Sequence, residues 1–200
     1  MSTFMTVAVL IFIAMSAALI AVIALLQWRN TRNQLALTAA AYSQSAGELL
    51  RQQWIADLPF VDYRNEIEVE IKFIAPLVTF LGFTPEQIDI RVPITVQIGR
   101  QTTNGQADWV LWAPGRRAPI AVIEAKGPTE TLGASVLGQA RSYAFALNAP
   151  LMVLTNGRQL DIYRRGVQSD QRIVTATIDT LAKQWPNIVA AFGQSNQVEP

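Results

Sequence analysis

Apolar and polar positions divide the chain into stretches of different character. The first stretch, 1–28, contains a run without charged side chains over 4–26, which as a helix is long enough to cross a hydrocarbon core of about 30 Å. Polar positions mix with alanine and leucine over 29–58, which predicts a helical spacer. Short patterned runs separated by turn residues then predict one folded domain over 59–192, followed by a disordered tail over 193–200.

Within the domain, the patterns predict a mixed α/β sheet flanked by helices, in the order αβββαββ with a short strand and a helix at the end. The first helix is expected over 64–83, with Asn65 as its N-cap and a kink at Pro76. Its apolar residues at helical spacing are Ile67, Ile71, Ile74, Leu77, Val78 and Leu81. Residues 101–106, "QTTNGQ", predict a turn. The other expected elements are strands over 87–99, 107–113, 120–127, 150–157 and 158–165, a helix over 131–148, and the closing strand and helix within 174–192.

The uncharged run over 4–26 has two explanations other than a membrane anchor. A cleaved signal peptide requires a basic n-region, and the N-terminal "MST" supplies no basic side chain. A buried soluble helix is less consistent with a run that is apolar on all sides. We therefore expect a single-pass anchor in the inner or plasma membrane. Because Arg29 and Arg32 follow the run, the C-terminal domain is expected in the cytoplasm.

The residue inventory narrows the chemistry that the domain can perform. The chain has 200 residues, with 16 basic and 15 acidic side chains, so its overall charge does not indicate a nucleic-acid partner. It contains neither cysteine nor histidine, which excludes disulfides, thiolate zinc sites and Ser-His-Asp catalysis. Proton transfer near neutral pH must therefore use carboxylates, lysine, tyrosine or metal-bound water.

The stretch "ADWVLWAPGRRAPIAVIEAKG", 107–127, holds the strongest candidate chemistry. Glu124 and Lys126 share one strand face because side chains alternate along a strand. An odd hairpin loop, such as 114–118, brings Asp108 opposite Glu124 on that face, whereas an even loop sends it to the other face unless a bulge intervenes. Two neighbouring carboxylates need a cation, and magnesium accepts carboxylates, waters and phosphate oxygens. The three side chains thus suffice for metal-dependent phosphodiester hydrolysis, although "EAK" alone is more often a salt bridge at a strand end.

Five segments of the chain, taken in order, resemble the PD-(D/E)xK nuclease superfamily. More closely, they resemble the N-terminal nuclease domain of the type I restriction enzyme R subunit. The segments are "RNEIEVEIKFIAPLVTFLGF", "ADWVLW", "PIAVIEAKGP", "QARSYA" and "PLMVLTNGRQLDIYR", and the resemblance covers about 62–165. It implies a restriction-endonuclease-like mixed sheet flanked by helices.

The resemblance also implies roles for individual residues. Asp108 and Glu124 match the metal-binding carboxylates, the carbonyl of Ala125 is a further ligand, and Lys126 matches the catalytic lysine. The expected cofactor is magnesium, with manganese as the alternative.

Three more residues of the resemblance lie on helices. Glu66 fits the family's early glutamate best, and Glu70 lies one turn later on the same face, so the choice between them stays open. Gln139 and Tyr143 match the Gln-x-x-x-Tyr motif and share one face of their helix.

The implied function is that of a membrane-anchored, magnesium-dependent endodeoxyribonuclease that binds DNA and hydrolyses phosphodiester bonds. The alternative is a catalytically inactive nuclease-fold module that binds DNA or a protein partner at the membrane. A third interpretation, an adaptor that oligomerises through its spacer, requires heptads over 33–55, and these are not clear.

Ala107 stands where the superfamily has proline, and no ATP-binding Gly-x-x-x-x-Gly-Lys pattern occurs. Translocation, sequence reading or methylation would therefore have to come from separately encoded proteins, and the expected assembly is a complex with such proteins or a homodimer. Candidate phosphate contacts are Arg116, Arg117, Arg141, Arg158, Arg164 and Arg165.

Overall fold

The computed structural model describes residues 27, 29–34, 44–98 and 101–193. The chain divides into two compact units, Met1–Leu50 and Arg51–Pro200. In the first unit, the described residues are helical. The expected anchor over 4–26 lies outside the described residues, as does all of the expected tail except Gly193. Among the described residues, no helix combines the length and the apolar character that crossing a membrane requires.

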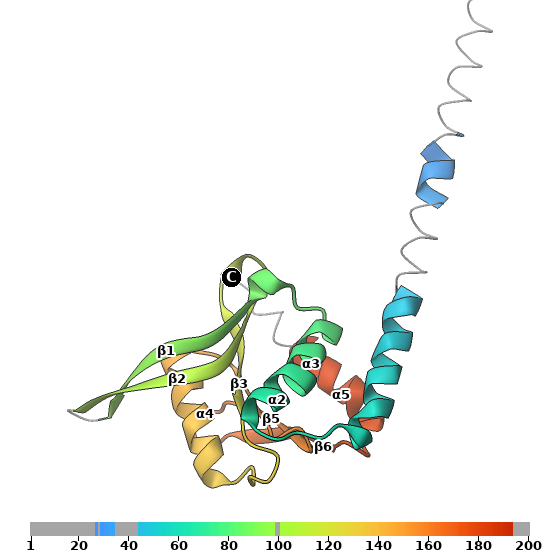
Figure 1. Ribbon diagram of the computed structural model, residues 1–200. Coiled ribbons are helices and arrows are strands. Elements are labelled where there is room, and N and C mark those ends of the chain that lie inside the picture. Colours follow the sequence, from blue (N-terminus) through green and yellow to red (C-terminus); the bar gives the residue numbers. More distant parts are fainter. Residues whose placement is uncertain (1–26, 28, 35–43, 99–100, 194–200) are drawn as a thin grey trace, which may run out of the picture. The chain divides into compact units, whose positions relative to one another are not determined.

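The second unit is built on a six-stranded mixed sheet whose strands lie side by side in chain order (Figure 1). Only β3 and β4 run parallel, and every other neighbouring pair is antiparallel. The strands are β1 (Ile88–Ile98), β2 (Gln101–Trp112), β3 (Pro119–Ala125), β4 (Leu151–Thr155), β5 (Gln159–Arg164) and β6 (Gln171–Thr177). The expected mixed sheet and its order of elements are therefore confirmed.

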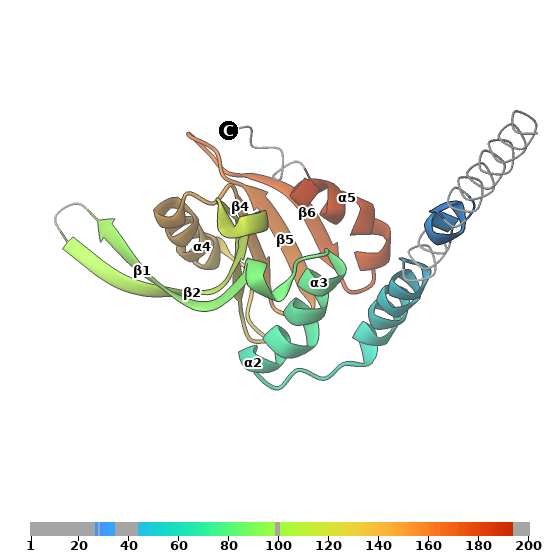
Figure 2. The same cartoon turned by 90° about the horizontal axis from the view of Figure 1, so that it is seen from above.

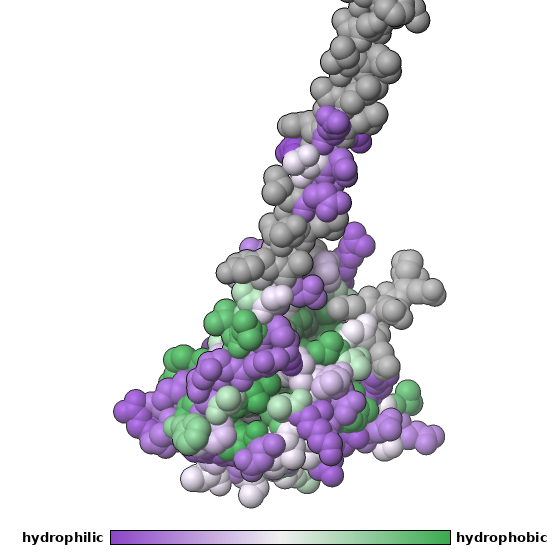
Figure 3. Space-filling model, turned by 90° about the vertical axis from the view of Figure 1, so that its right-hand side faces the viewer, coloured by the Kyte–Doolittle hydropathy of each residue, from purple (hydrophilic) through white to green (hydrophobic). Residues whose placement is uncertain are grey.

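Helices cover both faces of this sheet (Figures 1 and 2). One apolar core lies between the sheet and α4 (Ala134–Leu147). A larger one lies on the other face, beneath the helical residues 66–80, called the first helical segment, and α5 (Leu181–Gly193). The first helical segment is continuous but irregular, and it consists of α2 (Glu66–Val69), the π-turn η2 (Glu70–Ile74) and α3 (Ala75–Phe80). Short 3₁₀ turns complete the unit at η1 (Leu58–Phe60), η3 (Pro85–Gln87) and η4 (Pro114–Arg116). On the face shown in Figure 3, hydrophobic and hydrophilic side chains are interspersed.

The predicted turn over 101–106 is wrong. These residues belong to β2 and pair with β1 in an uninterrupted register, from Gln101 opposite Ile98 to Gln106 opposite Pro93. Strand pairing along a long hairpin, which projects from the rest of the sheet in Figure 1, overrides the weak turn preference of polar residues. Residues 99–100, between the two strands, lie outside the described residues.

Candidate functional site

Asp108 and Glu124 meet at the point where β2 and β3 separate. Trp109 pairs with Ile123, and this register carries Asp108 to the position across from Glu124. Asp108 is buried, and its Oδ2 accepts a hydrogen bond from the backbone N–H of Ala125 at 2.8 Å. The structure thus brings the two carboxylates to the same end of the sheet.

The β2–β3 hairpin reaches this register through an even loop and a bulge. Trp112 pairs with Pro119, which leaves six residues, 113–118, between the paired positions. An even loop alone would turn Asp108 to the opposite face, but the register shifts between Leu111 and Trp112 and reverses that effect. Of the alternatives that the sequence leaves open, the structure has the one that needs a bulge.

Glu124 and Lys126 form an ion pair at the end of β3. Lys126 Nζ donates to Glu124 Oε1 at 2.5 Å, whereas Glu124 Oε2 is buried without a hydrogen-bond partner among the described residues. Glu124 is only 1% exposed, and burial raises the pKa of its carboxyl to about 7, partly against the effect of Lys126. Burial works to lower the pKa of Lys126, but the hydrogen bond to Glu124 and the surrounding carboxylates raise it above its usual value. Lys126 is therefore a hydrogen-bond donor at neutral pH.

The strand that carries this pair is apolar because it runs through the middle of the sheet. Side chains from Ile120 to Ile123 are buried on both faces, and β4 pairs alongside in parallel with Leu154 opposite Glu124. The strand ends at Ala125, after which the N–H of Lys126 donates to the carbonyl of Thr155 at 2.9 Å. A buried parallel strand therefore delivers two polar side chains to its C-terminal end.

Arg91 joins this site, although the sequence analysis did not select it. Its guanidinium donates to Asp108 Oδ1 at 2.8 Å and to Glu70 Oε1, and it lies 3.9 Å from Glu66 Oε1. Arg91 occupies an ordinary polar position of an alternating strand, so no local pattern distinguishes it. Knowledge of the β1–β2 register would have indicated Arg91. Ile90 pairs with Trp109 and Val92 pairs with Ala107, which places Arg91 across from Asp108.

Both glutamates that the sequence proposed for the early position lie beside Arg91. Glu70 is buried, and its Oε2 also accepts a hydrogen bond from the indole N–H of Trp109 at 2.9 Å. Glu66 is more exposed, and burial together with Asp108 raises the pKa of its carboxyl. Glu70 thus makes the direct contacts and Glu66 lies at the margin.

Gln139 and Tyr143 lie on α4 and contact each other, with Gln139 Nε2 at 3.4 Å from the Tyr143 hydroxyl. Tyr143 packs against β2 at Gly105, where a Cβ atom would lie 2.6 Å from Tyr143 Cε1. In the part of the chain that the structure describes, neither side chain forms a hydrogen bond with Asp108, Glu124 or Lys126. The structure therefore places this pair against the β1–β2 hairpin and outside the ionic cluster, which consists of Glu66, Glu70, Arg91, Asp108, Glu124 and Lys126.

The side-chain oxygens at the strand ends are of the chemical type that hard divalent cations bind. Asp108 and Glu124 supply carboxylates, and Glu124 Oε2 is a buried oxygen that accepts no hydrogen bond from any residue the structure describes. Both oxygens of Asp108, in contrast, accept hydrogen bonds, from Arg91 and from the N–H of Ala125. No group of three acidic side chains within the described ranges lies close enough together to hold a metal ion.

Most of the arginines selected for phosphate contacts are held by contacts within the protein. Arg116 pairs with Asp89, and Arg141 pairs with Asp170 at 3.3 Å. Arg158 donates to the carbonyl of Val61 and lies over the ring of Tyr63. Arg165 donates to the carbonyl of Ala149 and to Asn148.

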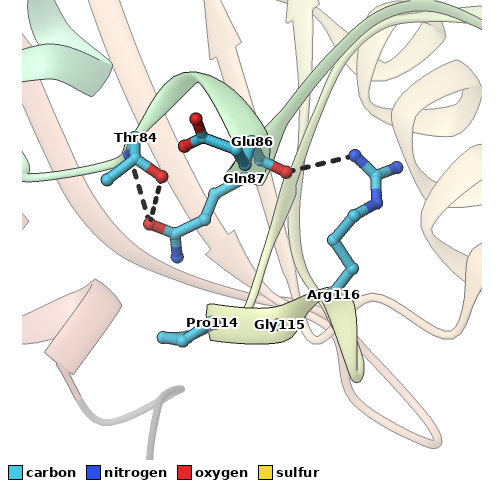
Figure 4. A pocket seen from close by; sticks show the side chains of 6 residues that line it. All are labelled: Thr84, Glu86, Gln87, Pro114, Gly115 and Arg116. Carbon is cyan, nitrogen blue, oxygen red and sulfur yellow. Dashed lines mark hydrogen bonds between the residues drawn. The ribbon is translucent and has the colours of Figure 1, made fainter.

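A separate cavity of about 420 Å³ lies between η3 and η4 (Figure 4). Its lining residues are Thr84, Glu86, Gln87, Pro114, Gly115 and Arg116. Gln87 accepts hydrogen bonds from Thr84, and Arg116 donates to the carbonyl of Glu86 at 3.2 Å. None of these residues belongs to the ionic cluster, so this cavity is not the candidate site.

The chain thus folds as a mixed α/β domain with two carboxylates and a lysine at adjacent strand ends. The family model described as Type I restriction enzyme R protein N terminus (HSDR_N) matches residues 65–179, more than half of the chain, and the chain belongs to this family. A solved fragment assigned as an HsdR subunit of a type I restriction enzyme from Vibrio vulnificus YJ016 is 24% identical, with a TM-score of 0.44. The match covers 66% of this chain and 27% of that one, so this chain spans about a quarter of that relative's length. No curated protein matches the sequence.

Proposed function

We propose that this chain is a metal-dependent endodeoxyribonuclease that hydrolyses phosphodiester bonds in DNA. The observation that carries the proposal is the convergence of Asp108, Glu124 and Lys126 at the ends of β2 and β3. Membership of the R protein N-terminus family supports the same function.

Asp108, Glu124 and the carbonyl of Ala125 would hold magnesium, or manganese in its place. The bound ion would acidify a coordinated water and stabilise negative charge on the phosphate. The N–H of Ala125 holds Asp108 in position, and burial keeps the free oxygen Oε2 of Glu124 available for a ligand.

Lys126 would act as a hydrogen-bond donor to the phosphate or to the attacking water. Its side chain is 14% exposed, so the ammonium borders solvent while Glu124 fixes its position. Glu66 would help to orient the water at the margin of the site. Gln139 and Tyr143 would contact DNA from α4, beside the projecting hairpin.

We further propose that residues 4–26 anchor the chain in the inner or plasma membrane, with the domain in the cytoplasm. Their uncharged sequence and the following arginines support this placement. Fractionation of cells that express the full chain, or a chain without residues 1–28, tests it. Recovery of both proteins in the soluble fraction would contradict the anchor.

A second function, a catalytically inactive module that binds DNA or a protein, is favoured by one observation. Arg91 engages the carboxylate of Asp108, so this ligand position is already satisfied within the protein. Such a module would act as a homodimer or with separately encoded proteins.

A cleavage assay on the full-length chain separates the two functions. Supercoiled, linear and single-stranded DNA are incubated with magnesium, with manganese or with a chelator. We expect metal-dependent cleavage by the unaltered protein and a loss of about a hundredfold or more in Asp108→Asn and Lys126→Ala.

Asp89→Asn is the matched control for Asp108→Asn. Asp89 lies on the partner strand and also pairs with an arginine, Arg116, but it stands outside the ionic cluster. Cleavage that survives in Asp108→Asn would remove the proposed site. A folded protein that binds no metal and cleaves no DNA would favour the inactive module.

A further inference from the structure

Three carboxylates, one from β2 and two from the first helical segment, converge on the guanidinium of Arg91. Asp108 on β2 accepts from Nη1 at 2.8 Å, and Glu70 on η2 accepts from Nη2. Glu66 lies 3.9 Å from Nη1. Arg91 therefore holds the position that a small cation would take beside Asp108, between the sheet and the first helical segment.

The backbone of β1 departs from regular strand geometry to place this side chain. Arg91 has a φ of 59°, in the left-handed region that residues other than glycine rarely adopt. The β1–β2 pairing omits Arg91 while continuing on both sides, with Ile90 opposite Trp109 and Val92 opposite Ala107. Gln106 Nε2 donates to the carbonyl of Arg91 at 3.2 Å and supports the turned backbone. Such a conformation persists only where its surroundings hold it, and it clusters at functional sites.

Charge counting shows that Arg91 neutralises the cluster only in part. The four carboxylates are Glu66, Glu70, Asp108 and Glu124, and the two cations are Arg91 and Lys126. With all four carboxylates ionised, the state that a bound cation favours, the formal charge is −2, which one divalent cation would balance. One of these four carboxylates, Glu124, has the oxygen Oε2 that lacks a hydrogen-bond partner among the described residues.

We propose that Arg91 is a built-in counter-ion of this site, and that a divalent cation binds by displacing its guanidinium from Asp108. This inference rests on the proposed metal-dependent function. The Arg91 side chain is 39% exposed, so it has room to withdraw toward solvent. Only molecules in which Arg91 has left Asp108 can bind the metal, so the apparent affinity falls in proportion to the fraction of such molecules. Arg91 is thus a positioning residue that sets metal affinity.

Manganese binding to the full-length chain, measured by electron paramagnetic resonance and calorimetry, tests the proposal. We expect Arg91→Met to bind Mn²⁺ about tenfold more tightly than the unaltered chain, or tighter still. Arg116→Met is the matched control, because Arg116 pairs with Asp89 outside the cluster. Its Mn²⁺ affinity should not change.

A second variant guards against misfolding, because Arg91→Met leaves the buried carboxylate of Glu70 without its cation. In Glu70→Gln/Arg91→Met the amide oxygen can still accept from the indole of Trp109. The same gain in Mn²⁺ affinity is expected. In the unaltered chain, saturation with Mg²⁺ should shift the guanidinium NMR signals of Arg91 and leave those of Arg116 in place.

Each outcome bears on the proposal separately from the nuclease function. A gain in Mn²⁺ affinity on removal of Arg91, with Arg91 signals that shift on Mg²⁺ binding, supports it even if no DNA is cleaved. Equal or weaker Mn²⁺ binding by both variants overturns it, even if the unaltered chain is an active nuclease. Arg91 signals that stay in place at saturating Mg²⁺ also overturn it. An absence of Mn²⁺ binding in every protein overturns both proposals.

Discussion

Two buried side-chain oxygens, Tyr63 Oη and Glu124 Oε2, lack a hydrogen-bond partner among the described residues. Leaving such a group unpaired costs about 1–3 kcal/mol. The orphaned oxygen of Glu124 lies among ionisable groups at strand ends, where a cation could satisfy it. The hydroxyl of Tyr63 lies in the core, where the ring packs against Gly157. A missing hydrogen-bond partner therefore indicates a candidate ligand position at Glu124 and a cost in stability at Tyr63.

Replacing Tyr63 by phenylalanine should stabilise the fold by about 1 kcal/mol, because it removes a buried hydroxyl that has no partner among the described residues. Burial raises the pKa of Tyr63 from 10.0 to about 12. A raised pKa contributes stability that is present below pH 10 and lost as pH rises through 12. Urea unfolding should therefore show a gap between Tyr63→Phe and the unaltered protein that widens from pH 10 upward. A less stable Tyr63→Phe would mean that the hydroxyl has a partner.

Glu68 gives a pH dependence of the opposite sign. Hydrogen bonds from the Arg64 side chain, from Lys72 and from the Arg64 backbone lower its pKa from 4.5 to about 2. A lowered pKa contributes stability that is present above pH 4.5 and lost as pH falls through 2. Glu68→Gln should be less stable than the unaltered protein at neutral pH, and the difference should close between pH 4.5 and 2 in unfolding titrations. A difference independent of pH would contradict the ionic role.

At the scale of elements, the first helical segment departs most from its predicted pattern. Ile67 and Ile71 were expected on its apolar face, but they are exposed, whereas Val69 and Phe73 are buried. The π-turn η2 is the reason, because its extra residue rotates the buried face. The rotation also turns Glu70 inward, where it reaches Arg91.

The contact between α4 and β2 depends on a glycine. Gly105→Ala would put a Cβ atom 2.6 Å from Tyr143 Cε1 and should force the tyrosine away, with a loss of about 1–2 kcal/mol in unfolding free energy. Gly138→Ala, on α4 with open space at its Cβ, should instead add about 0.5–1 kcal/mol. Urea unfolding of the two variants measures this contrast. Equal effects of the two substitutions would mean that Tyr143 does not rest on Gly105.

At the scale of the molecule, the folded unit begins before the expected domain boundary. Trp54, within the predicted spacer, packs on Phe73 and Phe80 with ring centroids 5.7 and 5.4 Å away, and on Trp185 at 6.3 Å. Its indole N–H donates to the carbonyl of Lys72 at 3.3 Å. Pro76, four residues later, has no N–H that could donate to that carbonyl as in a regular α-helix.

Trp54→Ala should therefore destabilise the domain by about 3 kcal/mol, through lost packing and the lost hydrogen bond to the carbonyl of Lys72. Thermal or urea unfolding of the full chain measures this loss. Substitution of the exposed Leu49 by alanine is the control and should have little effect. If both substitutions were neutral, the segment before residue 59 would not be part of the folded unit.

Local patterns predicted most of the elements. Alternation predicted the strands, helical spacing predicted the helices, and the motifs around Asp108 and Glu124 predicted two carboxylates and a lysine at the strand ends. The turn over 101–106 and the exposed face at Ile67 and Ile71 escaped prediction, because pairing with a distant strand and a π-turn decide them. Arg91 was not predicted, because only the register of β1 against β2 brings it beside Asp108.

By itself, the sequence determined the order of elements, the limits on chemistry set by the absence of cysteine and histidine, and the candidate residues on each strand. Hydrophobic periodicity and composition depend on residues close together in the sequence, so they can be read without the structure. Only the tertiary structure decided that a bulge turns Asp108 toward Glu124 and that Arg91 occupies the carboxylate of Asp108. Both depend on how strands far apart in sequence align, and one residue of register reverses every side chain.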